Sequence, residues 1–321
     1  MSDSRPPAAN YCGLDIGGTK IELIACGDDL QVGYRRRVAT PTRNYDDFLR
    51  AVTRLVKEAE DHLGTACQAV GIGLPGVREQ ASGRHLSANV PALTGQRIEH
   101  DLQKLLQRPL YLGNDLQCFA LSEAHGGAAA GYPSMLGAIL GTGAGGGYCI
   151  EGRLVGGYNG IAGEWGHWTV PATLLQIHAL PVLDCACGLR GCVERYVSGG
   201  GLALIHAHCA RSQHAGDTGL DACAIAALAE QGDAVALHAL AIHRDLLGHT
   251  LASLIMALDP HVIVLGGGLS KLDSLYRELP HAIAKHLFKG LCVPPILPPQ
   301  FGDAGGARGA VLLARQRSLA F

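Results

Sequence analysis

The chain has 321 residues with 44 Gly, 11 Cys and a formal net charge of -2. A sequence pI of about 6.7 argues against a nucleic-acid-binding protein, which would carry a basic face. No apolar run is long enough to span a bilayer, and the N-terminal stretch MSDSRPPAAN lacks the apolar core of a secretory signal. We therefore expect a cytoplasmic protein that binds neither nucleic acid nor membrane, of a size that favours two domains.

The first half of the chain alternates strand and helix patterns. Residues 11–26 predict a strand, a glycine turn and a second strand, as in a hairpin. Apolar spacing predicts a helix over 44–63, with two aspartates in its first turn. The other elements expected here are strands at 32–40, 70–74 and 109–112 and helices at 97–107 and from 115 to about 126.

The opening pattern returns at 136–150, which is again strand, glycine turn and strand. This weak internal repeat predicts two related lobes. An irregular stretch fills 151–200, and strands follow at 261–265 and 293–297. Helices are expected at about 201–211, 221–230, 233–258, 272–287 and 303–317. The order indicates an α/β fold with two mixed-sheet lobes around a cleft. We place the N-terminal lobe at 1–127 and the C-terminal lobe at 128–321, whose last helix can pack back on the first lobe.

The first glycine turn is a candidate anion site. The segment from Asp15 to Lys20 is neither a P-loop nor a Rossmann fingerprint. Glycines let backbone N–H groups approach a phosphate, and Thr19 and Lys20 could add donors. Asp15 could hold a hydrated Mg²⁺. An ordinary hairpin turn explains the same residues, so this motif alone decides nothing.

The second glycine turn, 141–147, favours the ligand interpretation. So many glycines in one apolar hairpin cost entropy and packing, which close approach of phosphates would explain. Two such turns on facing lobes suit the β- and γ-phosphates of ATP. The triplet 266–268 after a buried strand is a weaker third candidate, placed beside a purine or ribose.

Asn114 and Asp115 stand where a strand ends and a helix starts. An aspartate there often caps the helix, and it can also act as the base that accepts a hydroxyl proton in phosphoryl transfer. The sequence leaves both interpretations open and favours the cap.

His167, Cys185, Cys187 and Cys192 predict a structural zinc site, because C-x-C-x₄-C with flanking glycines suits a Cys₃His centre. Reactive or disulfide-forming thiols are the alternative. The other eight cysteines are expected in the core. If zinc orders this loop, Glu164 and Glu194 are held near one another and suit recognition of sugar hydroxyls; otherwise they are two solvated glutamates.

These residues together resemble the ROK family of sugar kinases, within the actin/hexokinase-like ATPase fold. The resemblance runs from about Tyr11 to Arg315. The motifs that carry it are LDIGGTKIE at 14–22, GLPG at 73–76, ANVPA at 88–92, GND at 113–115, GTGAGGG at 141–147, GEWGH at 163–167, CACGLRGCVERYVSG at 185–199, DPHVIVLGGGLS at 259–270 and GDAGGARGA at 302–310.

Three stretches look most like the branch that phosphorylates N-acetyl-D-glucosamine: ANVPALTG at 88–95, YDDFLRAV at 45–52 and CFALSEA at 118–124. An extended segment at 169–184 also fits this branch. The resemblance implies ATP-dependent phosphorylation of the sugar O6, with Mg²⁺ accompanying ATP, structural Zn²⁺ and a homodimer. It implies that Asp115 is the catalytic base and that sugar hydroxyls contact Asn89, Asn114, Glu164, His167 and Glu194. The implied nucleotide-binding residues are Gly13, Asp15, Gly17, Gly18, Thr19, Lys20, Gly141, Thr142, Gly143, Gly145, Gly146, Gly266, Gly267 and Gly268.

One departure from the family pattern concerns the catalytic helix. Members usually follow Asn-Asp with Ala-Asn, whereas Leu116 and Gln117 stand here, so we expect altered helix packing. A glucokinase or fructokinase of the family is the nearest alternative function. A sugar-responsive transcriptional regulator would need an N-terminal helix-turn-helix, for which the ten residues before the first hairpin leave no room. A zinc-dependent interaction module would need neither Asp115 nor two phosphate turns.

Overall fold

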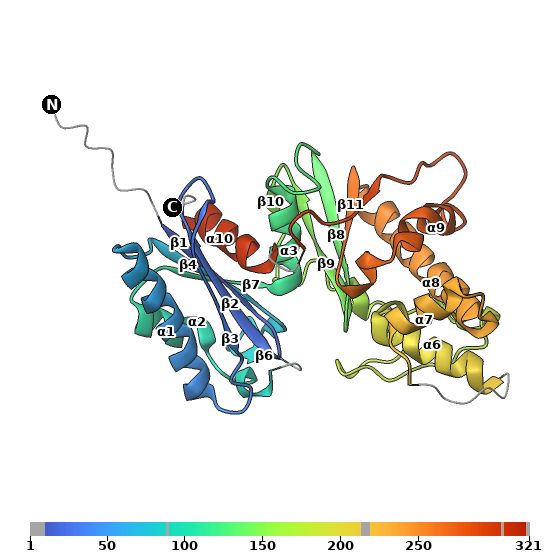
Figure 1. The fold of residues 1–321 in the computed structure, drawn as a ribbon, viewed down its shortest axis with the longest axis horizontal. Helices are drawn as coiled ribbons and strands as arrows, with labels where there is room; N and C mark the ends of the chain where they lie inside the picture. Colours follow the sequence, from blue (N-terminus) through green and yellow to red (C-terminus); the bar gives the residue numbers. More distant parts are fainter. Residues whose placement is uncertain (1–9, 88–89, 213–218, 303–304, 319–321) are drawn as a thin grey trace. The chain divides into compact units, whose positions relative to one another are not determined.

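The computed structural model describes residues 10–87, 90–212, 219–302 and 305–318, and the chain divides into two compact units (Figure 1). Unit 1 is drawn from 1–125, 153–162 and 303–321, and unit 2 from 126–152 and 163–302. From the sequence we expect the two lobes to meet between Gly127 and Ala128. The chain instead leaves unit 1 after His125 and returns to it twice, once as a short segment and once as the last helix.

The sheet of unit 1 has the strand order β3-β2-β1-β4-β7. Strands β1, β2 and β3 are antiparallel neighbours, whereas β4 and β7 run parallel to β1. The carboxyl ends of β1, β4 and β7 therefore lie at one edge of the sheet. The strands are β1 (Tyr11–Ile16), β2 (Lys20–Cys26), β3 (Val32–Ala39), β4 (Ala69–Leu74) and β7 (Leu110–Asn114).

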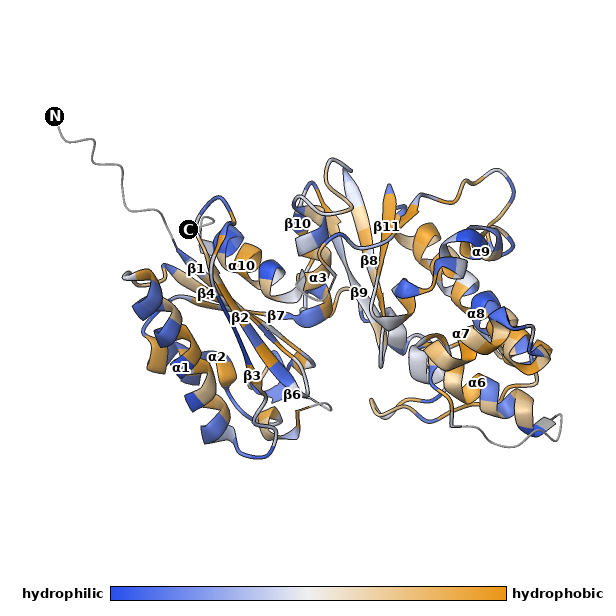
Figure 2. Cartoon of the chain, in the orientation of Figure 1, coloured by the Kyte–Doolittle hydropathy of each residue, from blue (hydrophilic) through white to orange (hydrophobic). Residues whose placement is uncertain are grey.

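Alternation along β1 separates two packed faces. Cys12, Leu14 and Ile16 share a core with the apolar side of α1 (Tyr45–Leu63), as the period of two in a strand requires. The mixed colouring of α1 in Figure 2 shows its polar side as well. The predicted helix is confirmed, and Asn44 caps it by accepting a hydrogen bond from the backbone N–H of Asp47.

The opposite face of β1 packs against α10 (Gly305–Ser318). A Cβ on Gly13 would meet the backbone carbonyl of Ala307 and, at 2.6 Å, Val311. Gly13 thus lies within the strand and its missing side chain lets the helix approach. This packing accounts for the glycine without a nucleotide.

We expect Gly13→Ala to lower the free energy of unfolding by about 3 kcal/mol, because the helix backbone must shift to admit one methyl group. Chemical denaturation measures the loss. Gly156→Ala is the matched control, since nothing lies within 4 Å of a Cβ built there. Equal stability of the two variants would contradict the packing argument.

Unit 2 repeats the strand order of unit 1. Its strands β9, β8, β11 and β12 are neighbours in that order, with β8 and β9 antiparallel and the rest parallel. The same arrangement relates β2, β1, β4 and β7, so the predicted internal repeat is confirmed. The strands are β8 (Ser134–Leu140), β9 (Ala144–Ile150), β11 (Val262–Gly266) and β12 (Ile296–Leu297).

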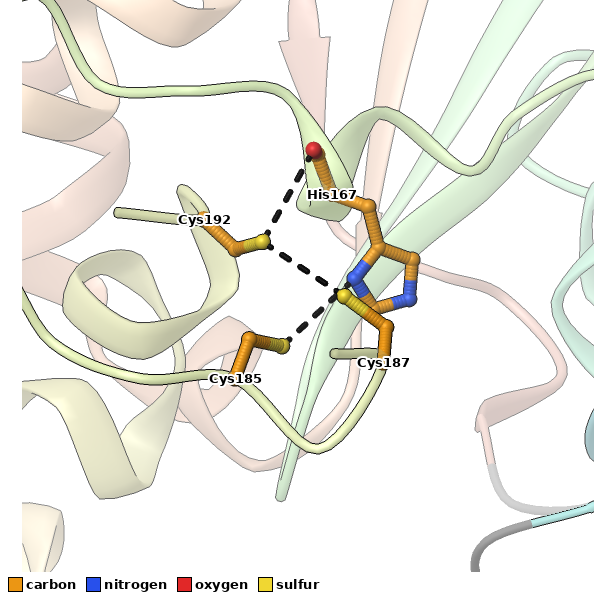
Figure 3. A group of neighbouring side chains, drawn as sticks. All are labelled: His167, Cys185, Cys187 and Cys192. Atoms are coloured by element: carbon orange, nitrogen blue, oxygen red, sulfur yellow. Dashed lines mark hydrogen bonds between the residues drawn. The ribbon is translucent and has the colours of Figure 1, made fainter. Parts of the chain in front are cut away.

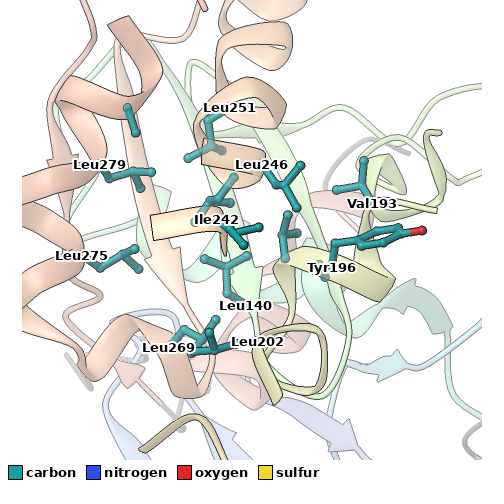
Figure 4. Close-up of a cluster of buried hydrophobic side chains, with 14 of the residues drawn as sticks. Leu140, Val193, Tyr196, Leu202, Ile242, Leu246, Leu251, Leu269, Leu275 and Leu279 are labelled. Carbon is teal, nitrogen blue, oxygen red and sulfur yellow. The ribbon is translucent and has the colours of Figure 1, made fainter. Parts of the chain in front are cut away.

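The core of unit 2 forms around the long helix α8 (Ala234–Leu258). Leu246 and Leu251 of α8 are buried with Leu140 of β8 and Leu279 of α9 (Figure 4). The other helices of this unit are α4 (Ala172–Ile177), α5 (Glu194–Val197), α6 (Gly199–Ser212), α7 (Ala222–Glu230) and α9 (Asp273–Ala284). Among the described residues, no single helix has the length and apolarity to cross a membrane; only α7 and α8 together, bent by 119°, meet that test.

Several short elements escaped the sequence patterns because each is too brief to show a period. They include β5 (Val77–Arg78), β6 (His85–Leu86), β10 (Arg153–Leu154) and the single 3-10 turns Pro91–Leu93, Trp165–His167 and Gly268–Lys271. Unit 1 also contains α2 (Ile98–Leu106) and α3 (Asp115–Ala124).

Candidate active site

The first glycine turn joins β1 to β2 as predicted. The backbone N–H of Gly17 donates to the carbonyl of Lys20 at 2.9 Å, which closes the turn. Thr40 holds it from the next strand end, with its hydroxyl donating to the carbonyl of Gly17 at 2.8 Å. A Cβ on Gly17 would meet only that Lys20 carbonyl, at 3.7 Å, so one side of the turn is open. Thr40 gave no sequence signal, since threonine is common at strand ends.

Asp15 stands just before this turn. Burial and the neighbouring charges of Asp115 and Glu22 raise the pKa of Asp15 to about 7, against the lowering effect of Lys20. The start of α10 covers the same carboxylate, because a Cβ on Gly306 would fall within 2.7 Å of all three Asp15 carboxyl atoms. Two mutually repelling carboxylates in one place suit a divalent cation. Gly306 belongs to the motif GDAGGARGA.

The structure separates the roles of Asn114 and Asp115. Asn114 is the N-cap of α3: its side-chain oxygen accepts a hydrogen bond of 2.8 Å from the backbone N–H of Leu116. The capping role that the sequence favoured for Asp115 is therefore filled by its neighbour. Burial raises the pKa of Asp115, opposed by backbone N–H groups. A carboxyl with a raised pKa is a better proton acceptor than an ordinary aspartate.

The loop after β4 lies beside these groups. The side-chain amide of Asn114 donates to the carbonyl of Gly76 at 3.5 Å. The imidazole Nε2 of buried His85 lies 3.0 Å from the carbonyl of Pro75. These two contacts fix the second half of the GLPG motif, Pro75 and Gly76. Asn89, predicted to contact sugar, lies outside the described residues.

The second glycine turn is shorter than predicted. Only 141–143 form the turn, closed by a 2.9 Å hydrogen bond from the N–H of Gly141 to the carbonyl of Gly143. Gly145 and Gly146 lie in strand β9, opposite Ile139 and Ala138. A Cβ on Gly146 would strike the neighbouring strand at Gly137, so tight packing explains that glycine. Thr142 is exposed in the turn itself.

Two further glycine segments meet this turn. Gly267, with φ of +79°, has no room for a Cβ because Leu140 lies 2.5 Å from its position. A Cβ on the next residue, Gly268, would meet nothing within 4 Å. The backbone N–H of Gly199, the first residue of α6, donates to the carbonyl of Gly141 at 2.9 Å. Helix N-termini attract anions, and the run of three glycines at 199–201 is the sequence signal of this close approach.

The four predicted metal ligands come together (Figure 3). The ligand atoms of His167, Cys185, Cys187 and Cys192 all lie within 4.8 Å of one another. The imidazole Nδ1 is 3.7 Å from the sulfur of Cys185, and the sulfurs of Cys187 and Cys192 are 3.7 Å apart. Two sulfurs bonded to one tetrahedral zinc stand about 3.8 Å apart. The cluster can bind a metal.

Both predicted glutamates are tied to this cluster. The other ring nitrogen of His167, Nε2, is 3.8 Å from the carboxylate of Glu164. At that distance the contact is electrostatic and longer than a hydrogen bond, and it places a carboxylate beside the side of the ring that faces away from Cys185. Glu194 follows Cys192 by two residues, and its carboxylate accepts a 3.0 Å hydrogen bond from the backbone N–H of Ala144. The metal loop therefore connects to the second glycine turn through Glu194.

Comparison with known proteins agrees with these features. A model described as the ROK family matches residues 11–317. The chain belongs to the ROK family. It is 44% identical over 303 residues to an N-acetylgalactosamine kinase from Shewanella sp. (strain ANA-3), covering 94% of this chain and 96% of that relative. It is 41% identical over 305 residues to an N-acetyl-D-glucosamine kinase from Yersinia pseudotuberculosis, covering 94% and 98%.

Solved structures agree on the fold. The ROK hexokinase from Thermus thermophilus superposes with a TM-score of 0.84 at 31% identity, covering 97% of this chain and all of that one. A ROK glucokinase from Streptomyces griseus, in complex with glucose and AMPPNP, gives 0.77 at 28% identity over 96% of this chain. The predicted hexokinase-like α/β fold is confirmed, and the protein is a sugar kinase.

Proposed function

We propose that the protein transfers the γ-phosphoryl group of ATP to O6 of N-acetyl-D-glucosamine. The observation that carries the proposal is at the start of α3. There Asn114 caps the helix, which leaves Asp115 with an uncommitted role and a carboxyl group of raised pKa. That carboxylate would accept the proton of the sugar hydroxyl as the oxygen attacks phosphorus.

The remaining predicted residues have roles in this proposal. Asn114, Glu164, His167 and Glu194 would bind sugar hydroxyls, as would Asn89. The turns at 17–19 and 141–143, with the open side of Gly268, would place backbone N–H groups around the phosphates and adenosine of ATP. Gly13 and Gly146 act through packing, because a Cβ on either would strike the neighbouring helix or strand. Gly145 lies in strand β9, opposite Ile139.

Two metals belong to the proposal. Mg²⁺ would enter with ATP beside Asp15, because a hydrated magnesium ion is usually held by one or two carboxylates and the nucleotide phosphates. It would neutralise charge that develops on the transferred group. Zn²⁺ would fill the His167 and cysteine cluster as a structural ion, with all four positions taken by protein ligands.

We also propose a cytoplasmic homodimer. None of the eleven cysteines, all of them among the described residues, forms a disulfide, which suits a reducing compartment. The dimer rests on family resemblance, and sedimentation equilibrium of the purified protein would measure it.

The sugar acceptor is the sharpest test of this function. We expect N-acetyl-D-glucosamine to give the highest kcat/KM in a panel with N-acetylgalactosamine, N-acetylmannosamine, glucose and fructose, because 41% identity joins the chain to kinases of that name. The 44% identity to an N-acetylgalactosamine kinase makes N-acetylgalactosamine, the C4 epimer of N-acetyl-D-glucosamine, the second candidate. A coupled ADP-release assay ranks the sugars. A preference for glucose or fructose would overturn the assignment to amino sugars.

A further inference from the structure

Residues 153–162 form a crossing segment: they belong to unit 1, although the chain before and after them belongs to unit 2. The segment ends two residues before Glu164. It contains little regular structure beyond β10. Glycines with positive φ, Gly157 at +77° and Gly160 at +73°, bend it, and Gly163 at +109° follows directly. Such a segment has few conformational restraints of its own, so its path depends on what holds it.

Gln117 of α3 holds the last turn of the crossing segment. Its side chain is 4% exposed, and its amide Nε2 donates to the carbonyls of Gly160 at 3.1 Å and Ala162 at 2.9 Å. Both amide protons of one buried side chain are used on one short stretch of backbone. Ala162 is half-buried, whereas Gly160 is exposed, so it is the Ala162 carbonyl whose loss of this partner would cost free energy.

Each residue of this contact is close in sequence to a residue of the proposed active site. Gln117 stands two residues after Asp115, on the helix that begins with that carboxylate. Ala162 stands two residues before Glu164, so at most about 7 Å of extended chain separates them. Within unit 2 the next residue, Gly163, is fixed by its carbonyl, which accepts a 2.9 Å hydrogen bond from the N–H of Gly146.

We propose that Gln117 is a positioning residue for the sugar acceptor: by fastening the carbonyls of Gly160 and Ala162 to α3, it sets where the chain enters the segment that carries Glu164. This role rests on the proposed function, because it supposes that Glu164 binds the sugar. It also gives a reason for the departure from the family pattern at this position. The side chain must reach two carbonyls at once, and asparagine is shorter by one methylene.

The test is the variant Gln117→Met, which keeps length and removes both donors. We expect the KM for N-acetyl-D-glucosamine to rise at least tenfold, while the KM for ATP changes less than twofold. The sugar KM of Gln117→Asn should lie between those of the wild type and Gln117→Met. Partial unfolding would lower the apparent kcat, because less enzyme is active, and would leave both KM values unchanged. A rise in the sugar KM alone therefore separates positioning from stability.

A matched control comes from the same crossing segment. The side-chain amide of exposed Gln80 donates to the carbonyl of Tyr158 at 3.2 Å, so Gln80→Met removes a bond to the crossing segment without touching α3. We expect its sugar KM to stay within twofold of wild type. Hydrogen exchange of the amides in 156–164 should quicken in Gln117→Met more than in Gln80→Met.

The outcomes separate the two proposals. An unchanged sugar KM in Gln117→Met, or equal effects of Gln117→Met and Gln80→Met, would overturn the positioning role and leave the kinase assignment intact. Wild-type protein that phosphorylates none of the sugars in the panel would overturn the proposed function, and the positioning role with it.

Discussion

Asp115→Asn should lower kcat for sugar phosphorylation by about 10²–10⁴, with little change in the binding of sugar or ATP. The substitution keeps the shape of the side chain and removes its capacity to accept a proton. Helix α3 should keep its stability, because its N-cap hydrogen bond comes from Asn114. Steady-state turnover and sugar binding by calorimetry measure the two effects separately.

The same argument gives a pH dependence. Because burial raises the pKa of Asp115, the proton-accepting form is lost at a higher pH than for an ordinary aspartate. Turnover of the wild type should therefore fall as the pH is lowered through that raised pKa. Asp61→Asn, an exposed change on α1, is the matched control and should leave kcat unaltered. Near-normal turnover of Asp115→Asn would refute its role as the base.

The second large effect concerns the metal cluster. We expect Cys192→Ser to lose the zinc that we propose for the cluster and about 3 kcal/mol of stability, since a structural zinc site contributes folding free energy directly. The thermal midpoint should fall by roughly 10 °C. Sugar KM should rise as well, because Glu194 follows this cysteine by two residues. Metal analysis, thermal unfolding and kinetics check the three expectations.

Burial alone must be separated from metal binding in this experiment. Cys149 is also buried in unit 2 and lies outside the cluster. Cys149→Ser should therefore cost stability while the protein keeps its zinc. Purified wild type without stoichiometric zinc, or a Cys192→Ser protein that retains it, would defeat the metal assignment.

The sequence predicted most long elements because their patterns were strong. The helix over 44–63 has a cap, acidic first-turn residues and a regular apolar stripe, and it was placed within one residue. The two hairpins were visible from apolar runs broken by glycines. The clustered cysteines needed only their spacing, since three ligands between Cys185 and Cys192 have few ways to be apart.

What the sequence could not show was which glycines serve packing. Gly13 and Gly17 look equivalent in the motif, yet the first faces α10 and the second bounds an open turn. That difference depends on a helix nearly 300 residues away. For the same reason the contacts of Thr40 and Gln117 were missed, because each donates to a backbone carbonyl brought close only by the tertiary fold. Gly306 was missed because the Asp15 carboxylate that it faces is equally distant in sequence.

The repeated crossings of the chain between its two units affect how the protein can fold as it is synthesised. Unit 2 uses only residues before 303, so all its strands and helices are available while the chain is still growing. Unit 1 needs α10 to cover Gly13 and the face of β1 around it. Its apolar face must therefore wait, exposed to solvent or a chaperone, until the ribosome has released the last helix.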